Sequence, residues 1–324
     1  MDNATKNAKS ESCRQSLIET LREALRPLRM RWFLGFAVLL TLAFGWPLGL
    51  LAVHAGNSSM HSHILLIPLI VLYLIRTQWA ELPREYSRSA RWAALPIVCG
   101  GAALTAAVVA SGGQSFVSLS HNDYLALMAF SYVCFMWSGG FLFLGKHWMG
   151  KAAFPVGFLV FLVPLPDGAV HWAENWLVLG SAEVTHLFFS ISGMPVYRDG
   201  TVFQIPGIVL QVAQECSGIR SSWVLFITSL LASYLFLRSP WHRVALVAVV
   251  IPLGILRNGF RILVIGLLCV HVGPEMIDSM IHHRGGPFFF AISLVPLFGL
   301  VWWLRRREAR AVSEDAIARQ SHAS

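Results

Sequence analysis

Residues 215–222, with the sequence ECSGIRSS, are the part of the chain best suited to chemistry. They stand directly before a long apolar run that begins at Trp223. A cysteine attacks as the thiolate, and the pKa of its thiol, ordinarily about 8.5, falls near a helix N-terminus or a cation. Polar residues at the mouth of a membrane helix cost free energy unless they are used or cap the helix. Cys216 is therefore a candidate nucleophile.

Two further polar clusters occur at residues 257–261 (RNGFR) and 282–286 (HHRGG). A histidine can take the proton of a thiol and return it to a leaving amine. An arginine inside an apolar run is expensive, and Arg261 can hold a developing oxyanion there. The free N–H groups at the start of the predicted helix, near Gly218 and Ile219, can assist. The chemistry implied is acyl transfer through a thioester.

Each of these residues also has a structural explanation. Arg261 can pair with an interfacial carboxylate such as Glu215 or Asp278, and Arg257, one turn earlier on the same face, can be the structural member. His283 is as good a chemical candidate as His282. Further residues are candidates for substrate-binding or supporting roles: Glu215, Ser217, Gly218, Arg220, Asn258, Arg257, His283 and His63. His63 is a candidate either to line the cavity that holds the site or to cap a helix.

The elements that position these clusters are membrane helices. The chain is 56% hydrophobic and 13% charged, with a mean hydropathy of +0.60. Because open sheet edges are excluded from lipid and the runs lack barrel alternation, we predict an all-α polytopic bundle with a small extracytoplasmic hairpin. About eight apolar runs approach the length of a membrane span, at 32–53, 62–75, 92–110, 122–145, 152–165, 218–237, 244–271 and 286–304.

The positions of Lys and Arg predict the orientation of these spans. The loops 54–61 and 111–121 contain neither residue, whereas basic residues follow alternate runs. We therefore predict a cytoplasmic basic tail at 1–31, a transmembrane domain at 32–304 and a cytoplasmic tail at 305–324. In this topology the segment 166–217 is extracytoplasmic. Cys216 and the two polar clusters then fall on that same side of the membrane.

The extracytoplasmic segment has its own pattern. Residues 170–192 mix tryptophan and leucine with charged side chains, which is typical of an interfacial amphipathic helix. Asp199-Gly200 lies between β-forming residues and predicts a tight turn of a hairpin. A second extended piece, 208–212, leads directly into Glu215 and Cys216.

Other classes of function are disfavoured. The net charge of +8 is concentrated beside apolar runs, which fits membrane orientation better than nucleic-acid binding. The five cysteines (Cys13, Cys99, Cys134, Cys216 and Cys269) show no CxxC motif and no metal-ligand spacing. We therefore expect neither a metal nor a cofactor. Motifs of serine or metal intramembrane proteases are absent.

The clusters together resemble the exosortase/archaeosortase family of integral-membrane cysteine transpeptidases. The resemblance rests on residues 215–221, on the Asn258-x-x-Arg261-Ile pattern, and on His282-x-x-x-Gly286 followed by two phenylalanines. Residues 62–68, 164–166 and 193–196 are also similar, so that the resemblance extends over about 32–304. It implies that the catalytic residues are Cys216, Arg261 and His282.

The resemblance also implies partners and a location. The expected substrates are exported proteins that carry a short motif such as Pro-Glu-Pro, a C-terminal transmembrane helix and a basic tail. The expected enzyme lies in the bacterial inner membrane, contacts lipid and no nucleic acid, cleaves after the motif and transfers the acyl group to an acceptor or water.

Two alternatives of other classes remain at this point. One is a polytopic transporter or channel that uses the same polar residues to line a cavity. The other is a non-catalytic assembly factor for exopolysaccharide export. Replacement of Cys216 separates them from an enzyme, because only the enzyme requires the thiol.

Overall fold

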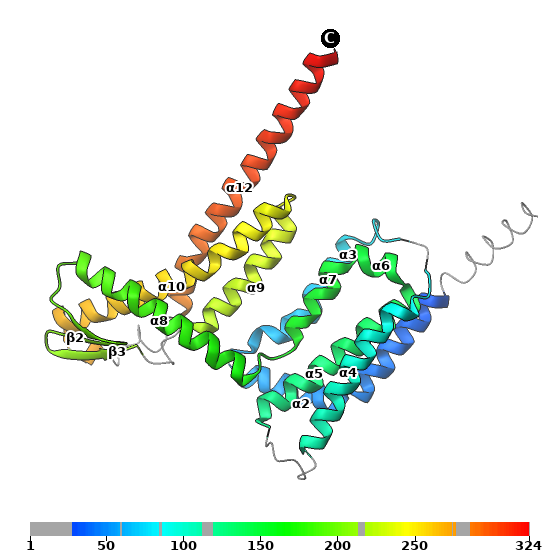
Figure 1. The fold of residues 1–324 in the computed structure, drawn as a ribbon, viewed down its shortest axis with the longest axis horizontal. Helices are drawn as coiled ribbons and strands as arrows, with labels where there is room; N and C mark the ends of the chain where they lie inside the picture. Colours follow the sequence, from blue (N-terminus) through cyan, green and yellow to red (C-terminus); the bar gives the residue numbers. More distant parts are fainter. Residues whose placement is uncertain are drawn as a thin grey trace, which may run out of the picture. The chain divides into compact units, whose positions relative to one another are not determined.

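The computed structural model describes residues 28–58, 60–83, 86–111, 119–212, 218–273, 275–276 and 286–323 (Figure 1). The described chain is mainly helical. It divides into two compact units, Met1–Asp167 and Gly168–Ser324.

The first unit is a set of helices joined by short connections. Its regular elements are Leu28–Ala43, α2 (Gly45–Asn57), η1 (Ser62–Leu66), α3 (Ile67–Thr77), α4 (Ala90–Ser111), α5 (His121–Gly139), η2 (Gly140–Leu144), α6 (Lys146–Lys151), α7 (Ala153–Phe158) and η3 (Leu159–Leu162). α5 begins where it does because the hydroxyl of Ser120 accepts a hydrogen bond from the N–H of Asp123 at 3.0 Å. Small residues let α4 and α5 approach closely, and Ser131 donates to the carbonyl of Gly100 at 2.6 Å.

The second unit combines long helices with a small sheet. Its elements are α8 (Asp167–Ile191, which begins at the last residue of the first unit), β1 (Tyr197–Asp199), β2 (Val202–Ile205), β3 (Ile208–Gln211), α9 (Ile219–Phe236), α10 (Pro240–His271) and α12 (Gly286–Ala323). α9, α10 and α12 contact one another. The fully buried side chains of Leu225, Leu246 and Leu297 form part of the core that these three helices share.

Glycines let α10 pack closely on α8. A Cβ atom at Gly259 would lie 2.7 Å from a methyl carbon of Val184, and one at Gly266 would lie 2.7 Å from the ring of Phe189. The same ring contacts Phe203 of β2 at a centroid distance of 5.9 Å. The face of α10 that carries these glycines is therefore the face turned toward α8 and the sheet.

The sheet confirms and extends the predicted hairpin. β1 and β2 are antiparallel and are joined at Gly200, with Asp199 opposite Val202. The extended piece predicted at 208–212 forms a third strand, β3, which pairs with β2 so that Phe203 lies opposite Leu210. The helix predicted at 170–192 is α8, and its position at the membrane interface stays a prediction.

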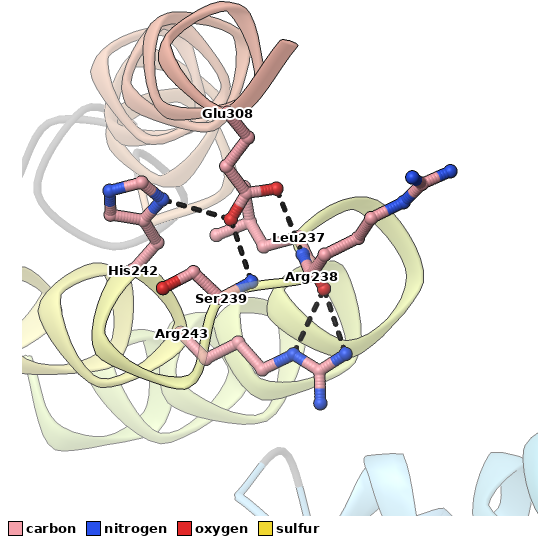
Figure 2. A network of polar contacts seen from close by, with 6 residues as sticks. All are labelled: Leu237, Arg238, Ser239, His242, Arg243 and Glu308. Carbon is pink, nitrogen blue, oxygen red and sulfur yellow. Dashed lines mark hydrogen bonds and ion pairs between the residues drawn. The ribbon is translucent and has the colours of Figure 1, made fainter. Parts of the chain in front are cut away.

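A carboxylate near the end of the apolar part of α12 caps the start of α10 (Figure 2). Glu308 accepts hydrogen bonds from the backbone N–H groups of Arg238 and Ser239, at 2.9 and 2.8 Å, and contacts Nδ1 of His242 at 2.9 Å. Free N–H groups at a helix start need such acceptors. Beside them, the guanidinium of Arg243 donates two hydrogen bonds to the carbonyl of Leu237, the C-cap residue of α9.

The helices confirm a polytopic membrane protein of the all-α class. Among the described residues, five helices are long and apolar enough to cross a membrane, or up to seven if each of two bent pairs is one span. Ser62–Thr77 is apolar but shorter. Each predicted apolar run overlaps helix, but the predicted number of eight spans is not confirmed. α10 continues through Pro252, and α12 continues through Pro296.

Candidate functional site

In the sequence, residues 215–222 follow β3 and include the first turn of α9. Glu215, Cys216 and Ser217 fall outside the described residues. The described chain leaves β3 at Val212, whose N–H donates to the carbonyl of Thr201 at 2.9 Å. It resumes at Gly218, the N-cap of α9. The predicted order, an extended strand before Cys216 and a helix that begins near Gly218, is therefore confirmed on both sides of Cys216.

Gly218 adopts a conformation that favours glycine. Its φ of 69° lies in the left-handed region, where a side chain would be strained. An added Cβ would also lie 2.9 Å from Nη2 of Arg257 and 3.1 Å from Oδ1 of Asn258. The structure thus brings together three of the predicted site residues, from two helices, within van der Waals range.

Arg257 is the buried arginine of the pair. Its side chain comes from the middle of α10 and the residue is 7% exposed. Nη2 donates to the carbonyl of Gly218 at 3.1 Å and to the hydroxyl of Ser222 at 3.3 Å. Its Nη1 has no hydrogen-bond partner among the described residues. Arg261, one turn later, is half-buried.

Asn258 fixes the rotation of α10 against α8. Its Nδ2 donates to the hydroxyl of Ser181 at 3.0 Å, and both residues are buried. Because buried polar groups need partners, this bond favours one register of the two helices. Ser181 was not among the predicted site residues. Ser181 lies in an apolar stretch of α8, and no motif in the sequence marks it as a functional residue.

Few of the other predicted residues of this unit are described by the structure. Arg220 is exposed on the first turn of α9. His282 and His283 lie outside the described residues, as does Asp278, which sequence reasoning offered as a partner of Arg261. Cys269, near the end of α10, is a buried free thiol, consistent with packing.

His63 belongs to the first unit, where it is buried. Its Nδ1 donates to the carbonyl of Met60 at 3.0 Å, because a carbonyl only accepts. Three further histidines gather at that end of the unit. The rings of His54 and His61 lie 5.1 Å apart and those of His54 and His121 lie 5.8 Å apart. Sequence reasoning missed this group, because His121 comes from a distant helix.

His61 is held in its uncharged form. Ser58 contacts Nδ1 of His61 at 3.1 Å. Burial, and next the nearby His54 and His63, lower the pKa of His61 to about 4. Among the described residues, no three His, Cys, Asp or Glu side chains are arranged to hold a metal ion.

These features define a polytopic helical membrane protein with a polar cluster where α9 begins. The model of the transmembrane exosortase family matches residues 55–299. The chain therefore belongs to the transmembrane exosortase family, and the match supports the general role of a membrane transpeptidase. No curated protein and no solved structure matches the chain.

Proposed function

We propose that this chain is a membrane-embedded cysteine transpeptidase that cleaves C-terminal sorting signals of exported proteins. The observation that carries the proposal is the family match, which spans Cys216, Arg261 and His282. The packing of the start of α9 against Arg257 and Asn258 supports it, because this contact joins two of the motifs that carry the chemistry.

In the proposed reaction, the thiolate of Cys216 attacks the carbonyl carbon of the scissile peptide bond. The C–N bond then breaks and leaves a thioester. His282 takes the thiol proton and gives it to the departing amine nitrogen. Arg261 stabilises the oxyanion, with N–H groups at the start of α9 as further donors.

An acceptor then resolves the thioester. Water, or an amine carried by a lipid or glycan, attacks the thioester carbonyl and expels the sulfur of Cys216. The proton of the acceptor passes through His282 to that sulfur, which restores the starting enzyme. Neither a metal nor a cofactor takes part in the proposed steps.

The proposed substrate is an exported protein that ends in a short motif, a transmembrane helix and a basic tail. A site on the extracytoplasmic face of the bacterial inner membrane fits such a substrate. The placement of Lys and Arg supports this orientation, with both termini in the cytoplasm. Glu215, Ser217, Arg220, His283 and His63 are proposed to bind substrate or support the site.

The test is substrate processing by Cys216→Ala in membranes that hold the full chain. We expect processing to stop while the protein still accumulates, and mass spectrometry of the wild type to detect a substrate fragment joined to Cys216. Cys99→Ala, which removes a half-buried thiol outside the proposed site, should process normally. Undiminished processing by Cys216→Ala would overturn the proposal and favour a transporter or an assembly factor.

A further inference from the structure

The first turn of α9 is held by one side chain of α10. The carbonyl of Gly218 accepts the first helical hydrogen bond of α9, from the N–H of Ser222 at 3.0 Å. The same carbonyl also accepts hydrogen bonds from the hydroxyl of Ser221 and from Nη2 of Arg257, each at 3.1 Å. Nη2 of Arg257 also donates to the hydroxyl of Ser222. Arg257 therefore binds both ends of this turn. Gly218, the left-handed residue that precedes α9, is thus held by a side chain of α10.

The guanidinium of Arg257 has more donors than these contacts use. It has five N–H donors, and the partners described for it are two uncharged oxygens, both bound through Nη2. Nη1 is buried and has no hydrogen-bond partner in the described part of the chain. A buried charge is costly unless it is paired. The environment of Arg257 thus favours an additional acceptor, preferably an anion.

The neighbouring helices do not supply that anion. α9 and α10 contain no acidic residue, and Arg220 and Arg261 are their other charged groups near this end of α9. On α8, Glu183 binds Arg198 in a two-pronged ion pair, with distances of 2.9 and 2.6 Å, and Glu174 pairs with His171. Within the described residues, no carboxylate forms an ion pair with Arg257.

The chain itself carries an ionisable group close by in sequence. Two peptide units join Gly218 to Cys216, and a fully extended chain separates such Cα atoms by at most about 7 Å. Arg257 therefore binds the chain two residues after the proposed nucleophile. A nearby cation lowers the pKa of a cysteine and favours the thiolate.

We propose that Arg257 is a positioning residue for Cys216: it anchors the left-handed turn at Gly218, and its charge, which no carboxylate of the described residues pairs, favours the thiolate. This inference rests on the proposed function, in which that thiolate is the nucleophile. It separates the roles of the two arginines, since Arg261 is left to act on the substrate.

The experiment measures the thiol of Cys216 without any substrate. The full-length protein in detergent is treated with iodoacetamide from pH 5 to pH 10, and mass spectrometry follows the peptide that contains Cys216. We expect a wild-type pKa below 8.5 and an increase of about one unit in Arg257→Gln, which is a tenfold loss of thiolate at neutral pH. Arg257→Lys should give an intermediate value, because it keeps the charge but loses the planar group.

Arg243→Gln is the matched control. Arg243 also lies on α10 and also donates to a backbone carbonyl at an end of α9, that of Leu237. It lies at the opposite end of α9 from Gly218, so its loss should leave the thiol pKa unchanged. An equal increase in both glutamine variants would show general loosening and overturn the inference.

Two other outcomes also overturn the inference. One is a wild-type pKa at or above 8.5, a measurement that requires no variant to fold. The other is an unchanged pKa in a folded Arg257→Gln protein. Because alkylation uses no substrate, these outcomes are distinct from failure of the proposed function, which appears as processing by Cys216→Ala.

Discussion

Arg257 and Gly218 are 39 residues apart in the sequence, and Nη2 of Arg257 lies 3.1 Å from the carbonyl oxygen of Gly218. The same helix sends a second arginine, Arg243, to the carbonyl of Leu237 at the other end of α9. α10 thus holds both ends of α9. The start of α9 consequently depends on α10 for its position.

Replacing Gly218 by alanine should destabilise the protein for two reasons. The left-handed backbone strains any side chain by about 1–3 kcal/mol, and the new Cβ would press on Arg257 and Asn258 at 2.9 and 3.1 Å. Gly207→Ala is a control for the first reason alone, since its φ is 85° and nothing lies within 4 Å of the added Cβ. Thermal unfolding in detergent should show the larger loss for Gly218→Ala. Equal losses would mean that the contacts do not matter.

The hydrogen bond between Asn258 and Ser181 should contribute to the free energy of unfolding. Asn258→Ala leaves the buried Ser181 hydroxyl without this partner, and such an unpaired group costs about 1–3 kcal/mol. The double variant Ser181→Ala/Asn258→Ala should lose less than the sum of the two single variants. Strict additivity in denaturant titrations would show that the two side chains do not interact.

Glu308→Gln should loosen the contact between α12 and the start of α10. The carboxylate accepts from two N–H groups and contacts His242, and loss of such a cap costs about 1–2 kcal/mol. Glu183→Gln offers a comparison, because Glu183 pairs with Arg198 at an exposed site. Exposed pairs contribute little, so its unfolding midpoint should stay close to that of the wild type. A larger effect at Glu183 would contradict this assignment.

Stability should fall with acid because of His61. Burial holds the pKa of His61 at about 4, below its ordinary value of 6.5. Between these values the unfolded chain binds a proton that the folded chain does not, so the free energy of unfolding decreases as the pH falls from 6.5 to 4. Unfolding midpoints of the wild type should therefore decrease more steeply over this range than those of His61→Gln. Parallel curves for the two proteins would count against the buried, uncharged histidine.

The sequence predicted the elements better than their contacts. The apolar runs, the Asp199-Gly200 turn and the extended piece before Cys216 all appear as helix, turn and strand. These features depend on the length and periodicity of neighbouring residues, which are visible in one dimension. The number of spans was less certain, because bent helix pairs and the short helix Ser62–Thr77 do not divide into spans by hydropathy alone.

The contacts of the candidate site divide in the same way. The sequence by itself determined that Arg257 and Arg261 share one face of a helix and that the polar residues 215–222 lie at the start of another helix. Only the tertiary structure decided that Arg257 is the arginine bound to Gly218 and that Ser181 holds Asn258. It also decided that Glu308 caps α10. The physical reason is that helical periodicity orders residues a few positions apart, whereas these partners meet only when helices distant in the sequence pack together.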